Sequence, residues 1–168
     1  VYRRGRFFSA LGVPIDRDGA TLIEPVPERG TLVEMGFDGI FSIRASGLHI
    51  PTGLMQDTDE ALWVADYQNP WLATSRLMRF TEDDEGRLHG RLVAWLPAEA
   101  GGFVPGQPVR LETGPYAGHL LLGDLATGRL YRVAYEPVEG GMKAGLFRVG
   151  GNWDGGAHRM VHHEGRYY

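Results

Sequence analysis

Two aspartates follow apolar stretches in a pattern that repeats along the chain. Asp66 closes the stretch Leu62-Trp-Val-Ala-Asp66, and Asp124 closes Leu120-Leu-Leu-Gly-Asp124. Carboxylates at corresponding places could face a shared channel and bind a metal ion or a polar ligand. Alternatively, each carboxylate accepts backbone N–H groups in the turn beyond its strand, which is a common use of Asp. The residue type favours this turn-fixing interpretation, and the ligand-binding interpretation stays open beside it.

Histidine is the natural candidate for a catalytic base, because its pKa lies near neutrality. Among the histidines we single out His49, which stands beside the turn-forming residues Pro51-Thr-Gly53. His162 and His163 are adjacent on an expected strand and point to opposite faces, so they cannot easily hold one ion together. No metal-ligand spacing of a recognised kind occurs, and we predict no metal site.

Two tryptophans lie in loops that could present a stacking surface. Trp71 follows Asn69-Pro70, and Trp153 lies in the glycine-rich stretch Gly150-Gly-Asn-Trp-Asp-Gly-Gly156. Each ring could bind a ligand, or it could cover the surface of a connector between structural units. The glycines do not indicate a phosphate site, because no strand-to-helix junction follows them.

The segments that carry these residues are short, rich in β-formers and separated by turn residues. The chain has 25 Gly and 10 Pro, and no stretch shows three turns of helical periodicity. We expect Pro51 and Gly53 to form a turn, and Arg87–Leu96 to be one long strand or two pieces broken at Gly90. Strands are predicted at Arg6–Leu11, Thr21–Glu24, Thr31–Met35, Ile40–Arg44, Gly53–Gln56, Ala61–Ala65, Arg76–Phe80, Pro108–Glu112, His119–Asp124, Arg129–Tyr135, Met142–Val149, His158–His163 and Arg166–Tyr168.

Two predicted strand pairs share the same sequence pattern, which indicates a repeat. An apolar strand ending in Asp is followed by Arg76-Leu-Met-Arg-Phe80 in one copy and by Arg129-Leu-Tyr-Arg-Val133 in the other. Units of this kind bury their faces only by stacking on neighbours. The sequence therefore predicts an all-β fold of the β-propeller class, with about three blades in a single partial domain. We expect 1–30 to form an edge, 31–96 and 97–150 to be blade-like units, and 151–168 to begin a further blade.

Composition excludes several classes of function. The net charge of −4 offers no basic surface for nucleic acid. No Cys is present, so disulfides, thiolate metal sites and Cys nucleophiles are excluded within this stretch. No apolar run approaches the length of a membrane span. The chain begins at Val1 and ends within an expected strand, so we expect it to be a processed product or a piece of a longer polypeptide.

Two motifs resemble those of a known family. Gly47-Leu-His-Ile-Pro-Thr-Gly-Leu54, followed by Leu62-Trp-Val-Ala-Asp-Tyr67, resembles the repeat of six-bladed propellers of the glucose/sorbosone dehydrogenase-like group. Gly114-Pro-Tyr-Ala-Gly-His-Leu-Leu-Leu-Gly-Asp124 looks like a stretch of secreted bacterial propellers in that group, some of which are fused to cytochrome c modules. The resemblance covers roughly residues 31–168. Six blades of about 40–50 residues exceed the 168 residues of this chain, so other chains or a longer polypeptide would complete the ring.

The resemblance implies a secreted or periplasmic module that binds a ligand or a partner protein through loops on one face, within a redox-associated assembly. Asp66, Asp124, Trp71 and Trp153 are the candidate ligand-binding residues. One alternative is a quinone-dependent sugar or aldehyde oxidoreductase, for which the resemblance implies pyrroloquinoline quinone and calcium. A second alternative is a lactonase-like metal-dependent hydrolase. The catalytic motifs of the quinone enzymes do not appear in this chain, so the fold is carried over and the catalytic residues are not.

Overall fold

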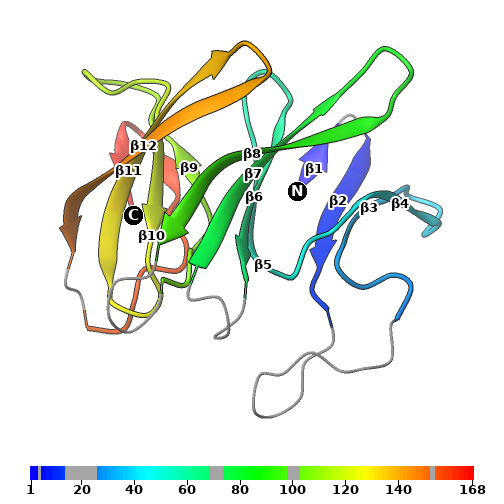
Figure 1. The fold of residues 1–168 in the computed structure, drawn as a ribbon, viewed down its shortest axis with the longest axis horizontal. Coiled ribbons are helices and arrows are strands. Elements are labelled where there is room, and N and C mark those ends of the chain that lie inside the picture. Colours follow the sequence, from blue (N-terminus) through cyan, green and yellow to red (C-terminus); the bar gives the residue numbers. More distant parts are fainter. Residues whose placement is uncertain (4, 14–25, 69–73, 98–102, 152–153) are drawn as a thin grey trace.

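The protein is built from three four-stranded antiparallel sheets that stand side by side (Figure 1). The computed structural model describes residues 1–3, 5–13, 26–68, 74–97, 103–151 and 154–168. Every regular element in these ranges is a strand, and none is a helix. The expectation of an all-β chain with repeated blade-like units is therefore confirmed for the described residues.

Each sheet is a meander whose strands pair with their neighbours in chain order. The first sheet contains β1 (Tyr2–Arg3), β2 (Arg6–Leu11), β3 (Thr31–Met35) and β4 (Phe41–Ser46). The second contains β5 (Ile50–Gln56), β6 (Leu62–Tyr67), β7 (Thr74–Glu82) and β8 (Leu88–Pro97). The third contains β9 (Val109–Arg110), β10 (Leu120–Gly123), β11 (Arg129–Val138) and β12 (Gly141–Gly151), and a hairpin of β13 (His162–His163) and β14 (Arg166–Tyr167) follows it.

The meander gives the stack two different ends. Tight turns at residues 57–60, 83–86 and 139–140 lie at one end, which we call the hairpin end. Segments 47–49, 103–108 and 124–128 lie at the other, which we call the loop end. Figure 1 shows the tips of the β7–β8 and β11–β12 hairpins on the same side of the molecule. Side chains at either end therefore come from several sheets.

The first and second sheets bury an apolar layer between them. Phe8 and Leu32 of the first sheet pack with Leu62, Val64 and Phe80 of the second. Leu62 and Val64 are two positions apart in β6, and Phe8 and Phe80 are each two positions from a partly buried neighbour, Ala10 and Met78, so these strands direct alternate side chains into this layer. The hydrophobic effect therefore holds the two sheets together, at roughly 25 cal/mol per Å² of apolar surface removed from water.

A second apolar layer joins the second and third sheets. Met55, Trp63, Ala65 and Leu77 point away from the first layer and pack against the third sheet, where β8 also lies against β12. The third sheet contributes Leu120, Leu122, Tyr131 and Val133. The second sheet is thus apolar on both faces, which is why Leu62-Trp-Val-Ala65 is a continuous apolar run rather than an alternating one.

Two glycines lie where backbones approach too closely for a side chain. A Cβ on Gly53 of β5 would come 2.5 Å from Cα of Gln107, and a Cβ on Gly123 of β10 would come 2.3 Å from the carbonyl O of Ala157. Such contacts require a residue without a side chain. Gly53 and Gly123 therefore allow the segments beside β9 and after β12 to pack tightly on the preceding strands.

Most predicted strands are present with shifted ends, and one expected turn is wrong. Pro51 and Gly53 lie inside β5, where a pairing irregularity between them absorbs the proline. The stretch around Gly90 forms the single continuous strand β8. The predicted strand Thr21–Glu24 lies outside the described residues.

Candidate functional site

The carboxylate of Asp66 joins three segments at the loop end of the second sheet. It is fully buried, with 0% of the residue exposed. The backbone N–H of His49 donates to both carboxylate oxygens, at 3.0 and 3.1 Å. The side chains of Gln68 (2.8 Å) and Arg76 (3.0 Å from Nε, 2.8 Å from Nη2) donate to Oδ2. Asp66 therefore fixes the segment that leads into β5 and the residues on both sides of the loop after β6.

The structure brings His49 and Asp66 together, although the contact uses the backbone of His49. The His49 ring places Nδ1 3.3 Å from the carbonyl O of Tyr67. A carbonyl can only accept, so Nδ1 is the donor, and in the neutral ring Nε2 then carries the lone pair. This tautomer is the one in which Nε2 can act as a base. A catalytic role for His49 stays a prediction.

Asp124 accepts backbone N–H groups at the corresponding position of the third sheet. It follows β10 directly and is 1% exposed. Its Oδ1 accepts the backbone N–H groups of Val104 and Ala126, each at 3.0 Å, and Oδ2 accepts the hydroxyl of Thr127. Val104 precedes β9 as His49 precedes β5. Both carboxylates therefore hold backbone N–H groups, in the manner of the turn-fixing interpretation, while their ligand-binding role stays a prediction.

The remaining predicted site residues cannot be placed. Trp71 and Trp153 both lie outside the described residues. In the part of the chain that the structure describes, no group of three or more His, Cys, Asp or Glu side chains is arranged to hold a metal ion.

A buried polar centre that we did not predict from the sequence lies between the second and third sheets. Asp57 begins the turn after β5 and is 5% exposed. Its carboxylate accepts Nε1–H of Trp63 (3.0 Å), Nη1–H of Arg110 (2.6 Å) and the hydroxyl of Tyr135 (3.4 Å). The sequence signal that could have identified this centre is an aspartate in a turn, Asp57, followed by a tryptophan in the next strand, Trp63. Asp57 links the two sheets at the hairpin end.

Burial and charge shift two pKa values in this centre. Burial raises the pKa of Tyr135 above its ordinary value, and the negative charge of Asp57 raises it further. Desolvation acts to lower the pKa of Arg110, but the neighbouring carboxylate of Asp57 outweighs it, so the net shift is upward. The centre therefore favours a neutral phenol and a charged guanidinium.

The raised pKa of Tyr135 predicts a loss of stability in alkali. A pKa that is higher in the folded state adds stability below the unfolded-state value of about 10, and this contribution is lost as the pH rises through the folded-state value. The measurement is the free energy of urea unfolding at several pH values from neutrality upward. Tyr135→Phe should show a smaller alkaline loss than the wild type. Equal losses in the two proteins would contradict the assignment.

A charged cleft lies between the first and second sheets at the hairpin end. Its volume is about 580 Å³. The first sheet contributes Arg3 and Arg6. The second contributes a group of carboxylates from two turns and from the end of β7: Asp59, Glu60, Glu82, Asp83 and Asp84. The charges that line this cleft come from both sheets.

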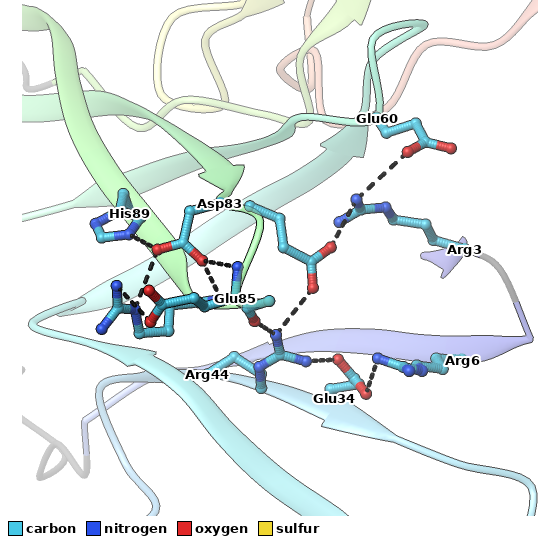
Figure 2. A network of polar contacts seen from close by, with 11 residues as sticks. Arg3, Arg6, Glu34, Arg44, Glu60, Asp83, Glu85 and His89 are labelled. Atoms are coloured by element: carbon cyan, nitrogen blue, oxygen red, sulfur yellow. Dashed lines mark hydrogen bonds and ion pairs between the residues drawn. The ribbon is translucent and has the colours of Figure 1, made fainter.

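The charged groups around this cleft form a network of ion pairs (Figure 2). Arg3 lies 2.9 Å from Glu82 and 3.6 Å from Glu60, and Arg44 lies 3.1 Å from Glu82. Arg44 also pairs with Glu34, which Arg6 contacts at 2.9 Å. These contacts join the first sheet to the second, so the cleft has a clear structural role.

Comparison with known proteins gives no family assignment. No protein-family model matches the chain, and no curated protein matches it either. Among the described residues, no helical segment has the length and apolar character of a membrane span. The architecture and the local geometry therefore carry the functional argument.

Proposed function

We propose that this chain is a sector of a six-bladed β-propeller of the glucose/sorbosone dehydrogenase-like type, and that it acts outside the cytoplasm as a binding module. The three four-stranded antiparallel sheets, stacked through apolar layers, support the architecture. Other chains or a longer polypeptide supply the remaining blades. The module binds a ligand or a partner protein through its loop end, within a redox-associated assembly.

The observation that carries the binding proposal is the repeated anchoring of the loop end. Asp66 and Asp124 each hold the backbone N–H of the residue near the start of their own sheet, His49 and Val104. Because its backbone is already fixed in this way, the loop end loses little conformational entropy when it binds a ligand or a partner. The hairpin end is different, because its exposed tips project beyond the sheets and its charges pair across the first two sheets.

A matched pair of histidine variants tests where the module binds. The probes are glucose, a sugar lactone, and pyrroloquinoline quinone with Ca²⁺, each titrated into the protein by calorimetry. His49→Ala at the loop end keeps the backbone N–H that Asp66 accepts, and it should weaken binding of the probe that binds by about tenfold, or about 1.4 kcal/mol. His89→Ala at the hairpin end should leave the affinity unchanged.

Two results would overturn the proposal. One is the failure of all three probes to bind. The other is a loss of affinity in His89→Ala equal to that in His49→Ala, which would place the binding surface at the wrong end. Dye-linked oxidation of glucose, measured in the same samples with the quinone and Ca²⁺, separates simple binding from oxidoreductase activity.

A further inference from the structure

The charged cleft between the first and second sheets contains a buried donor that its ion pairs do not satisfy. Arg3 lines the cleft, and only 6% of the residue is exposed. Its Nη2 contacts Glu82 at 2.9 Å, whereas its Nε is buried and has no hydrogen-bond partner among the described residues. A buried donor without an acceptor costs free energy, and in native proteins it commonly marks a place where bound water or a ligand supplies the acceptor.

Arg6 adds a second guanidinium to the same wall of the cleft. Its Nη1 contacts Glu34 at 2.9 Å, and 53% of its side chain remains exposed (Figure 2). A guanidinium has five N–H donors, so the contact with Glu34 leaves donors that a further acceptor can use. Because arginine binds carboxylates through paired N–H groups, the wall formed by Arg3 and Arg6 suits a carboxylate.

The opposite wall offers a carboxylate that the ion-pair network does not use. Asp84 lines the cleft, is exposed, and has no ion-pair or hydrogen-bond partner among the described residues. Asp59 also lines the cleft and keeps 52% of its side chain exposed while it pairs with Arg79. Glu82 and Asp83, by contrast, are each engaged by arginines of the network. Over the described ranges no group of three or more such side chains can hold a metal ion, so this wall suits an organic ammonium group.

The two walls together argue against a simple ion as the ligand. An anion bound to the arginines would lie across the cleft from five carboxylates of the second sheet. A cation bound to the carboxylates would leave Nε of Arg3 without an acceptor. A molecule that carries both charges satisfies both walls, because each of its charged groups then faces charges of the opposite sign.

We propose that this cleft binds a small zwitterion, either an amino acid or a short peptide. The carboxylate of the ligand contacts the guanidinium groups of Arg3 and Arg6. Its ammonium group contacts the carboxylates of Asp84 and Asp59. The cleft volume of about 580 Å³ lies within the range of about 300–1,000 Å³ that is typical of small-molecule pockets. All lining residues belong to the first and second sheets or to their turns, so the site lies at the hairpin end and does not depend on the loop-end binding proposed above.

Calorimetric titration with capped and uncapped probes tests both charges of the ligand. The probes are alanine and trialanine, each also prepared with an acetylated amino group and with an amidated carboxyl group. At least one uncapped probe should bind, and either cap should weaken its binding by about tenfold or more, because hydrogen bonds to charged groups are the strong ones. Whichever of alanine and trialanine binds more tightly identifies the source of the zwitterion, a free amino acid or a peptide.

Variants of two exposed lining residues match each charge of the ligand to one wall. Asp84→Asn should weaken binding of the uncapped probe by about tenfold and remove its preference over the acetylated form. Arg6→Gln should have an effect of similar size and remove the preference over the amidated form. Glu139→Gln, exposed in the turn between β11 and β12, is the matched control and should keep the wild-type affinities. Circular dichroism verifies that each variant is folded.

Several results would overturn the zwitterion site. These are a failure of both uncapped probes to bind, caps that leave the affinity unchanged, or wild-type affinity in both Asp84→Asn and Arg6→Gln. His49→Ala at the loop end should leave zwitterion binding unchanged, which separates this site from the proposed function. If the sugar and quinone probes fail while the zwitterion binds, the proposed function alone is overturned, and the reverse result overturns the zwitterion site alone.

Discussion

Trp63→Ala is expected to lower the free energy of unfolding by about 3–5 kcal/mol, the range typical of removing a large aromatic side chain from a core. Trp63 is fully buried in the layer between the second and third sheets. The substitution leaves a cavity against Tyr135 and removes the Nε1–H donor that Asp57 accepts at 3.0 Å. The substitution therefore weakens the contact that holds the second and third sheets together.

Urea unfolding of matched variants measures this effect. Trp95→Ala is the control, because Trp95 is 53% exposed and should cost much less. Trp63→Phe keeps most of the apolar surface and loses the hydrogen bond to Asp57, so its cost should fall between the two. If Trp63→Ala costs no more than Trp95→Ala, the second and third sheets do not stack through this layer.

Asp66→Ala is expected to destabilise the protein by about 3 kcal/mol, the lower end of the range for breaking a buried ion pair. The substitution leaves the N–H of His49 and the side chain of Arg76 without the carboxylate that they contact. Arg76 keeps partial access to water, with 18% of its side chain exposed, so solvent screening reduces its share of the loss. The backbone N–H of His49, just before β5, also loses its carboxylate acceptor, which adds to the cost.

The stability of Asp66→Ala is measured by thermal and urea unfolding, together with that of two comparison variants. Asp66→Asn retains one acceptor oxygen and should lose less than Asp66→Ala. Asp84→Ala, in an exposed turn at the hairpin end, should change stability by no more than about 0.5 kcal/mol. Equal stability of Asp66→Ala and Asp84→Ala would show that Asp66 does not anchor the loop end.

Strand positions were predictable wherever local chemistry alone decides them. Asp38-Gly39 and Asp57-Thr-Asp-Glu60 mark turns at the hairpin end, and the structure places both of them between paired strands. The repeated Arg-Leu-x-Arg segments lie in β7 and β11, where the pattern placed them. In these segments the turn residues and the apolar pattern agree, so tertiary packing does not override the local preference.

Features that depend on contacts between sheets were not predictable in this way. Pro51 suggested a turn, yet β5 accommodates it because the pairing with β6 shifts at this point. Asp57 looked like an ordinary turn residue, and its partner Arg110 lies 53 positions away in the sequence. The sequence of the first sheet alternates as expected for half-buried strands. Only the arrangement of the sheets shows that the face carrying Phe7, Met35 and Phe41 is exposed.

The candidate site was predicted in part. The repeat identified Asp66 and Asp124, and the structure shows that both anchor corresponding backbone segments. The proximity of His49 and Asp66 depends on the return of the chain from the first sheet to the second, and strand periodicity carries no information about it.

The stacking of the sheets is tested most directly by a nuclear Overhauser experiment on the aromatic rings of Trp63 and Tyr135. These residues belong to the second and third sheets, and their ring centres are 4.7 Å apart. We predict strong cross-peaks between the ring protons of the two residues in the folded protein. Assigned spectra of the folded chain without these cross-peaks would contradict face-to-face packing of the two sheets.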